Sequence, residues 1–451
     1  MACPSQRTTV RARGPRVAAC AADRGAGRLS IVVDTASFIF DIGFVLLLAA
    51  LAGWIARRVG LPDVIGWLAA GIVVGPFTPG FVADRTEIAV LADIGVVLLL
   101  FEVGLELDLR RIRRDSPTVL WAAPLQVFVT VGVSTALVGL ALGTGPVVSA
   151  IVGLAVASSS SAVIASLAGG DVHADRSLET AMSWSGIQDL VTVVLAAVLF
   201  SIDGVDDLPL PLAIAGLLLY AAAVVLVARV LPGILKKLLD AEDVFLLVSL
   251  ATAITMAGLG AIVFHVPVAL AAFVAGLAIT ESHETLQLRR NLMPFRAVFA
   301  VFFFVSIGFV FDPTLLGAAL PLLGLFIALV VLAKAAVIAG IGRTTRLTGH
   351  PVLVATALGQ MGEFGFVIAA TLLLNGQISK TTFAAVIAAV AISVAVSTIL
   401  YRALRGRLPR HRGAHRAAKE AGTSAIPLPT TSATTSATPP TSGTPSTSGP
   451  P

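Results

Sequence analysis

The stretch "SWSGIQDLVTVVLAAVLF" (183–200) is apolar enough to lie in a lipid bilayer, yet Gln188 and Asp189 stand side by side near its middle. An ionised aspartate at the centre of a transmembrane helix costs about 2.5–3.5 kcal/mol on insertion scales. Acidic side chains are therefore rare in such helices, and those that occur usually serve ion or proton pathways. The stretch predicts a membrane helix with a functional carboxylate.

The composition of the whole chain also indicates a membrane protein. Of 451 residues, 57% are hydrophobic and 13% are charged, and the mean hydropathy is +0.94. A soluble domain of this length would need far more polar surface. Small residues let transmembrane helices pack closely, and the chain has 41 glycines. We predict an all-α polytopic membrane protein in contact with the lipid bilayer.

Charge and cysteine usage exclude other classes of protein. The net charge is +5, but the basic residues lie in short loops and both tails, so we expect no nucleic-acid partner. The only cysteines, Cys3 and Cys20, lie in the N-terminal tail and predict neither a disulfide framework nor a metal site. We expect no cofactor, no catalytic residue and no enzymatic activity.

Thirteen apolar segments are predicted to cross the membrane, although the ninth is short for a full span. They cover approximately residues 36–56, 62–81, 88–107, 117–142, 146–168, 178–200, 209–235, 243–264, 267–281, 295–311, 315–342, 350–375 and 381–401.

The loops between these segments alternate in charge. Loops after odd-numbered segments are basic, as in "RRIRR" (110–114), whereas "DGVDD" (203–207) follows an even-numbered segment. Because basic loops remain in the cytoplasm, we expect a plasma-membrane protein with its N-terminus outside and its C-terminus inside. A missed helix would scramble this alternation, so the alternation supports the count of thirteen.

Three regions are predicted along the chain. Residues 1–30 form a basic, disordered extension that breaks the charge rule, and a mis-assigned translation start or a signal peptide would explain it. Residues 31–404 form the membrane domain. Residues 405–451 form a cytoplasmic tail, first basic and then rich in Ser, Thr and Pro, which we expect to be disordered.

An internal repeat is visible in the first pair of similar stretches. "LPDVIGWLAAGIVVG" (61–75) resembles "VPVALAAFVAGLAIT" (266–280), which aligns Gly71 with Gly276 at an offset of 205.

A second pair has nearly the same offset. "LLLFEVGLELD" (98–108) resembles "FFFVSIGFVFD" (302–312), which aligns Gly104 with Gly308 at an offset of 204. The offset corresponds to seven predicted helices, an odd number, so the two halves must have opposite orientations. Inverted repeats are typical of secondary transporters.

Two segments are predicted to be broken at corresponding positions. "ASSSSA" (157–162) interrupts the fifth segment, and "GQMGEFG" (359–365) interrupts the twelfth at about the same offset. Such discontinuous helices aim half-helix ends at a binding site near the membrane centre. The residues expected at this crossing are Ser159, Ser160, Ser161, Gln360, Gly362 and Glu363.

Two charged residues in the membrane are the principal site candidates. Asp189 is expected to bind the cation or proton, and Lys334 is expected to be its charge partner in the core. The other residues expected to bind the cation or proton are Gln188, Ser159, Ser160 and Ser161. In the internal repeat, Lys334 corresponds to a position near Thr130, and Asp189 corresponds to a position near Ser393. The two charged residues therefore have no charged counterpart in the other half of the repeat. That asymmetry favours a binding site over a packing device.

Other acids in the segments are assigned weaker roles. Glu363 is a candidate for lining the site or for neutralising half-helix N-termini. Glu102, Glu106, Asp41 and Asp93 are expected to be interfacial or paired.

The chemistry follows from a buried carboxylate. Desolvation favours the protonated form of the carboxylate, whereas a nearby ammonium favours the ionised form. The group can therefore bind either a proton or a monovalent cation, but not both together. If such a site faces the two sides of the membrane alternately, this competition alone produces cation–proton exchange.

At these residues the sequence resembles the second monovalent cation:proton antiporter family, especially its Kef-like potassium branch. The resemblance runs from about residue 36 to 401, in the order of the family. The stretches that carry it are "LPDVIGWLAAGIVVGP", "GVVLLLFEVGLELD", "SSSSAVI", "GIQDL", "FFFVSIGF" and "GQMGEFGFV".

The resemblance implies a sodium/proton-antiporter-like fold, a homodimer, and a mobile core domain beside a dimerisation domain. It also implies that Asp189 binds the ion, that segments five and twelve cross, and that Lys334 is the family's core lysine. The transported ions would be K⁺ or Na⁺ and H⁺.

The chain departs from the family in several places. Electrogenic relatives carry two adjacent acids where this chain has Gln188 and Asp189, Ser161 stands where Kef-like members usually have Thr, and Glu102 replaces a commonly apolar residue. Kef-like systems append a nucleotide-binding regulatory domain. We expect that control to be absent here unless a separate regulatory subunit supplies it.

Two alternative functions stay open from the residues alone. A gated cation channel or sensor subunit would need a continuous polar stripe, whereas polarity here is confined to one central cluster. A sodium-coupled carrier of organic anions on the same scaffold would need several Asn, Gln or Glu ligands, and the crossing offers mainly Gln188, Gln360 and Glu363.

Overall fold

Most of the residues that the computed structural model describes are helical. The described residues are 35–78, 85–107, 112–114, 116–168, 175–202, 210–237, 241–264, 266–279, 285–345 and 347–407. The predicted extension (1–30) and nearly all of the predicted tail (405–451) lie outside them. The chain divides into two units, Met1–Tyr401 and Arg402–Pro451, and the fold is that of the first.

The helices follow one another without a strand in the described part of the chain. Their bounds are α1 Thr35–Arg58, α2 Asp63–Val74, α3 Arg85–Glu106, α5 Val119–Leu142, α6 Pro146–Ala157, α7 Ser161–Ala168, α8 Arg176–Ile202, α9 Leu210–Lys237, α10 Glu242–Phe264, α11 Val268–Ile279, α12 Thr285–Val310, η2 Pro313–Leu315, α13 Leu316–Ala328, η3 Leu329–Ala335, α14 Ala336–Thr344, α15 Pro351–Leu358, α16 Glu363–Leu374 and α17 Lys380–Arg407.

The protein is a multi-pass membrane protein, but the predicted count of thirteen spans is not confirmed. Among the described residues, eleven helices are long and apolar enough to cross a membrane. The predicted segments 62–81 and 267–281 contain only the short helices α2 and α11, of 12 residues each. A helix of 12 residues rises about 18 Å, less than the roughly 30 Å hydrocarbon core.

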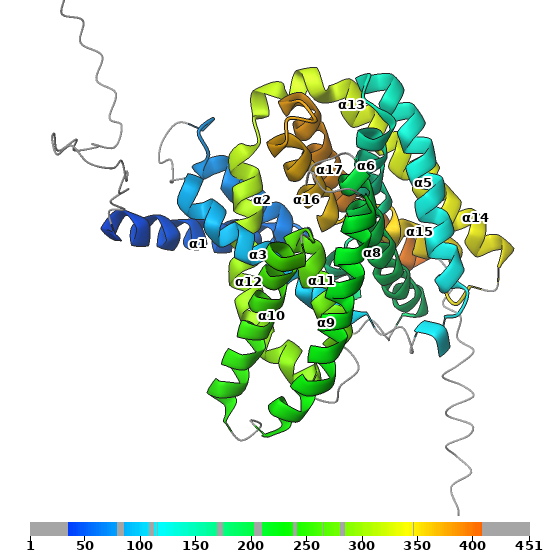
Figure 1. Cartoon of the computed structure of the whole chain (residues 1–451). Coiled ribbons are helices and arrows are strands. Elements are labelled where there is room, and N and C mark those ends of the chain that lie inside the picture. Colours follow the sequence, from blue (N-terminus) through cyan, green and yellow to red (C-terminus); the bar gives the residue numbers. More distant parts are fainter. Residues whose placement is uncertain are drawn as a thin grey trace, which may run out of the picture. The chain divides into compact units, whose positions relative to one another are not determined.

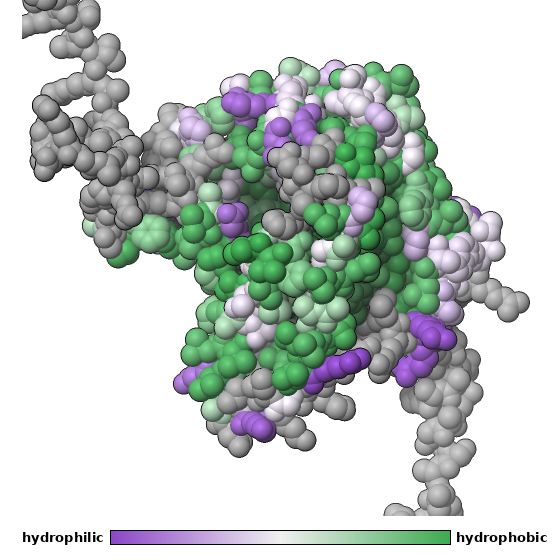
Figure 2. All heavy atoms as spheres, in the orientation of Figure 1, coloured by the Kyte–Doolittle hydropathy of each residue, from purple (hydrophilic) through white to green (hydrophobic). Residues whose placement is uncertain are grey.

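Apolar side chains cover most of the face of the molecule in Figure 2, and hydrophilic residues gather near its upper and lower ends. Large exposed side chains on the outer helices, such as Leu47, Trp54 and Leu140, belong to this apolar surface. In water such a surface would drive aggregation, whereas in a bilayer it contacts lipid.

The helices pack into two groups (Figure 1). The scaffold helices are α1, α2, α3, α10, α11 and α12, with α3 packed closely on both α11 and α12. The core helices are α5 to α8 and α13 to α17, with α8 in contact with α5, α6, α7 and α15. Helix α9 contacts both groups, through α8 on one side and α10 and α11 on the other.

Glycine contacts within the scaffold reproduce the predicted inverted repeat. A Cβ built on Gly71 would lie 2.9 Å from the Cα of Gly308, and a Cβ built on Gly104 would lie 3.0 Å from the Cα of Gly276. The repeat aligns Gly71 with Gly276 and Gly104 with Gly308, so each close contact is the image of the other. The backbones of α2 and α12, and of α3 and α11, touch at these points because glycine has no side chain.

Both predicted helix breaks are present in the core. The fifth predicted segment forms α6 and α7, separated by extended backbone at Ser158. The twelfth forms α15 and α16, separated at residues 359–362, where Gly362 is extended. These two broken helices lie against each other and position the candidate site.

We predict that Gly71→Ala and Gly308→Ala each destabilise the protein, by about 1–3 kcal/mol, because the added methyl group meets backbone atoms that have no free space to move into. The measurement is the midpoint of thermal unfolding in detergent. Gly258→Ala is the matched control, since nothing lies within 4 Å of its Cβ position. An alanine there should be neutral or stabilising, because Ala is the better helix former. Equal effects at all three positions would contradict the close contact.

Candidate ion-binding site

The two helix breaks are joined by hydrogen bonds. The backbone N–H of Gly362 donates to the carbonyl oxygen of Ser158 at 3.1 Å, and Gln360 Nε2 donates to the carbonyl oxygen of Ser160 at 3.2 Å. The hydroxyl of Ser159 donates to a carbonyl oxygen at the end of α15 at 2.9 Å. Each break therefore satisfies backbone groups that its partner leaves unpaired, which is why neither helix has to be continuous.

Lys334 lies at the point where these breaks meet. It is fully buried, and its ammonium donates to the carbonyl oxygen of Ser158 and, at 2.6 Å, to that of Gln360. These carbonyls stand at the C-terminal ends of α6 and α15, which carry partial negative charge. The lysine thus compensates two half-helix ends with one positive charge.

The local helix geometry brings Lys334 there. Residues Leu329–Ala335 form a π-helical turn (η3), in which one extra residue widens the helix. Such turns are frequent at functional sites. The hydroxyl of Thr130 on α5 donates to a carbonyl oxygen within this turn, that of Ala333, at 2.7 Å. Thr130 is also at the position that corresponds to Lys334 in the internal repeat.

Asp189 lies in the middle of α8 and is 2% exposed. One turn earlier, the hydroxyl of Ser185 donates to the carbonyl oxygen of Ser159 at 2.8 Å, which fixes α8 against the first break. The charged side chains whose fields act on Asp189 are Glu363, Lys334 and Glu106.

The expected charge pair of Asp189 with Lys334 stays a prediction. The ion pairs found among the described residues join Arg57 to Asp63 and Arg296 to Glu102, and neither includes Asp189. Lys334 instead binds backbone carbonyl groups and acts on Asp189 through its field.

Five buried side-chain oxygen atoms on α8 and in the two breaks have no hydrogen-bond partner in the described structure. They are Asp189 Oδ1, Gln188 Oε1, Thr192 Oγ1, Ser158 Oγ and Gln360 Oε1. An unpaired buried polar group costs about 1–3 kcal/mol, so such a gathering calls for an explanation by a bound water or ion. Carboxylate, amide and hydroxyl oxygens are the ligands that hard cations take in proteins.

Sequence reasoning missed one polar residue of the site, Gln126 on α5. Its amide oxygen accepts from Gln188 Nε2 and, at 3.4 Å, from Trp184 Nε1, and its amide nitrogen donates to Thr130 at 2.9 Å. A chain of hydrogen bonds therefore links the neighbour of Asp189 to the π-helical turn next to Lys334. The available signal was an isolated amide within the apolar segment 117–142.

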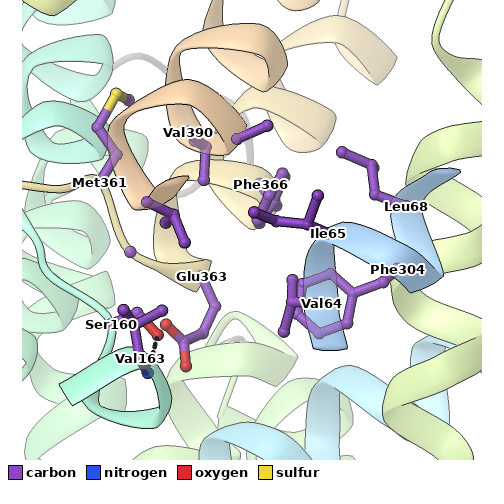
Figure 3. Close-up of a pocket in the computed structure, with 13 residues that line it drawn as sticks. Val64, Ile65, Leu68, Ser160, Val163, Phe304, Met361, Glu363, Phe366 and Val390 are labelled. Carbon is purple, nitrogen blue, oxygen red and sulfur yellow. Dashed lines mark hydrogen bonds between the residues drawn. The ribbon is translucent and has the colours of Figure 1, made fainter. Parts of the chain in front are cut away.

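Glu363 begins α16 and is buried at 9% exposure. In Figure 3 its carboxylate points toward Ser160, whose hydroxyl accepts from the N–H of Val163 at 3.2 Å and so caps α7. Arg296 and Glu102 also act on Glu363 through their charges. The prediction that Glu102 is paired is confirmed, since it forms an ion pair with Arg296.

The fold matches a solved antiporter. The sodium/proton antiporter MjNhaP1 of Methanocaldococcus jannaschii superimposes with a TM-score of 0.65 over 81% of this chain and 97% of that protein, at 16% sequence identity. At that identity the likeness shows the fold alone.

Relatives in sequence cover most of the chain. YbaL of Escherichia coli is 30% identical over 348 residues, 72% of this chain and 61% of YbaL, so the chain spans less than two thirds of that relative. The Na⁺/H⁺–K⁺ antiporter GerN of Bacillus cereus is 28% identical over 361 residues, 78% of this chain and 92% of GerN.

A family profile settles the classification. The profile described as "Sodium/hydrogen exchanger, transmembrane" matches residues 46–404, which include the scaffold helices, both broken helices, Asp189 and Lys334. The family consists of transporters rather than enzymes. The chain belongs to the sodium/hydrogen exchanger family.

Proposed function

We propose that the protein is a monovalent cation:proton antiporter that exchanges K⁺ or Na⁺ for H⁺ by alternating access. The observation that carries the proposal is Asp189: a carboxylate with 2% exposure and one unpartnered oxygen, on the helix that is fixed to the crossing of two broken helices. A buried carboxylate of this kind gains free energy by binding a proton or a cation.

The exchange follows from competition for this one carboxylate. A bound proton and a bound cation each neutralise Asp189, and only a neutralised site crosses a low-dielectric barrier at modest cost. An empty, ionised carboxylate does not cross, so each movement carries either H⁺ or the metal cation. Uncoupled leak of either ion is thereby suppressed.

The other site residues have separate roles in this proposal. Gln188 and the serines of the first break, Ser159, Ser160 and Ser161, provide neutral oxygens to the cation. Gln360 and Gly362 keep the second break close to the first. Lys334 holds the half-helix ends together and supplies a fixed positive charge near Asp189.

The antiporter function is favoured over the two alternatives. Five buried oxygen atoms without partners in the described structure belong to α8 and the two breaks, and a local polar cluster of this kind fits a carrier better than a channel. A carrier of organic anions would need more basic or amide groups facing the site. The relative GerN is named an antiporter of both Na⁺ and K⁺, and it supports cation exchange without deciding between the two ions.

We further propose that the protein works in the plasma membrane as a homodimer, with its N-terminus outside and its C-terminus in the cytoplasm. Arg57 and Arg58 end α1, Arg343 lies in the last turn of α14, and Arg405 and Arg407 end α17. In the orientation that places basic residues inside, we expect the ends of α1 and α14 to face the cytoplasm. The homodimer is inferred from the family resemblance.

We predict that Asp189→Asn abolishes cation-dependent dissipation of a pH gradient in everted membrane vesicles, while the protein remains folded and inserted. The amide keeps the volume of the side chain but cannot bind and release a proton. Asp93→Asn is the matched control, because Asp93 is an exposed carboxylate on α3 and its loss should leave exchange intact. Exchange at the wild-type rate in Asp189→Asn vesicles would rule out Asp189 as the carrier.

We also predict electroneutral exchange, because Gln188 is uncharged and we expect Lys334, which donates to two carbonyl oxygens, to keep its proton during the cycle. One proton then replaces one cation at Asp189. In proteoliposomes, an imposed membrane potential should leave the exchange rate unchanged. An acceleration by voltage that disappears in Lys334→Gln would show instead that the lysine carries a second proton.

A further inference from the structure

A narrow cavity lies between the scaffold and core helices and ends at Glu363 (Figure 3). Val64 and Leu68 of α2 and Phe304 of α12 form its scaffold wall, and Phe366 of α16 and Val390 of α17 form part of its core wall. It holds about 360 Å³ of atom-free space, part of it open. Phe304 and Phe366 meet edge to face across it, with ring centroids 5.5 Å apart.

Glu363 is the only charged side chain among the described residues that line this cavity. None of the ion pairs found in the described part of the chain includes it. The basic side chain whose charge acts on Glu363 is Arg296 of the scaffold, and its guanidinium is already bound to Glu102. A largely buried carboxylate that lacks a direct counter-ion and faces a cavity is prepared to accept a proton or a cation.

The cavity and Asp189 are separated by the short break in the first crossed helix. Ser160 lines the cavity, whereas the carbonyl oxygen of the preceding residue, Ser159, accepts a hydrogen bond from Ser185, one turn from Asp189. Glu363 is one of the charged side chains whose fields act on Asp189. The first break therefore contacts both the cavity that contains Glu363 and α8, the helix of Asp189.

A second cavity, which no carboxylate lines, serves as a comparison. It lies between α8, α11 and α16 with about 690 Å³ of atom-free space, part of it open, and its lining is apolar except for Thr371. The hydroxyl of Thr371 already donates to the carbonyl oxygen of Val367 at 2.9 Å. Ile65 near the first cavity and Leu270 in the second are related by the repeat offset, so the two cavities occupy related positions, but only one presents a group that binds ions.

We propose that Glu363 is a staging site for the transported cation and proton, through which they pass between this cavity and Asp189. This inference rests on the proposed antiport function and extends it by a second carboxylate. Two ionised carboxylates that act on each other through their charges repel, so a proton or cation bound at either one relieves the repulsion. An ion that arrives at Glu363 is then favoured to move on as soon as Asp189 loses its own.

The first test is the transport kinetics of Glu363→Gln in proteoliposomes. A staging site increases the local concentration of cation, so its loss should raise the apparent KM for the cation about tenfold, with the maximal rate nearly unchanged. Glu363→Asp, which keeps the charge, should recover most of the affinity. An unchanged KM in Glu363→Gln would overturn the proposal.

Glu106→Gln is the matched control for these kinetics. Glu106 also acts on Asp189 through its charge but does not line the cavity. Its loss should change the KM by much less than the loss of Glu363. An equal rise in both variants would mean that Glu363 acts only through its field and is not a staging site.

The second test needs no transport and so separates this proposal from the antiport function. In a background with Cys3 and Cys20 replaced by serine, Val163→Cys places a thiol in the cavity at Glu363, and Val193→Cys places one in the apolar cavity. The two valines are similarly buried, at 2% and 4% exposure. A charged, membrane-impermeant methanethiosulfonate should label the first thiol and spare the second. Labelling of neither, or of Val193→Cys alone, would overturn the proposed route.

Discussion

The crossing of two broken helices is the constraint on which the rest of the structure depends. A helix that stops in the middle of a membrane leaves backbone carbonyl and N–H groups unpaired where no bulk water is available to them. Here the buried ammonium of Lys334 donates hydrogen bonds to carbonyl oxygens at the C-terminal ends of both α6 and α15. Hydrogen bonds between the breaks, such as that from the N–H of Gly362 to the carbonyl oxygen of Ser158, pair other backbone groups. The polar centre that results lowers the free-energy cost of burying the carboxylate of Asp189.

Much of this architecture is predictable from the sequence. Hydropathy places the helices, the offset between Gly71 and Gly276 indicates inverted halves, and the serine and glycine runs locate both breaks. These features follow from local composition, which physical rules relate directly to structure. The predicted count of thirteen spans is not confirmed, because hydropathy marks an apolar segment and not the length of the helix within it: α2 and α11 have only 12 residues each.

Sequence reasoning was weaker for contacts that depend on side-chain direction. Gln126 was missed, because a single amide in an apolar segment carries no spacing signal until the fold brings it to Gln188 and Thr130. The π-helical turn at Lys334 has no signature in "LVVLAKA", and it decides where the ammonium points. The pairing of Glu102 was expected, but its partner Arg296 lies 194 residues away and could be identified only from packing.

The central claim is that cation and proton movement are coupled at one carboxylate. The most direct measurement uses purified wild-type protein in proteoliposomes with an imposed pH gradient and the membrane potential clamped to zero. Addition of K⁺ or Na⁺ should dissipate the gradient, and the flux of the cation should match that of protons in the opposite direction. Cation flux that proceeds without any counter-movement of protons would contradict the account and indicate a channel.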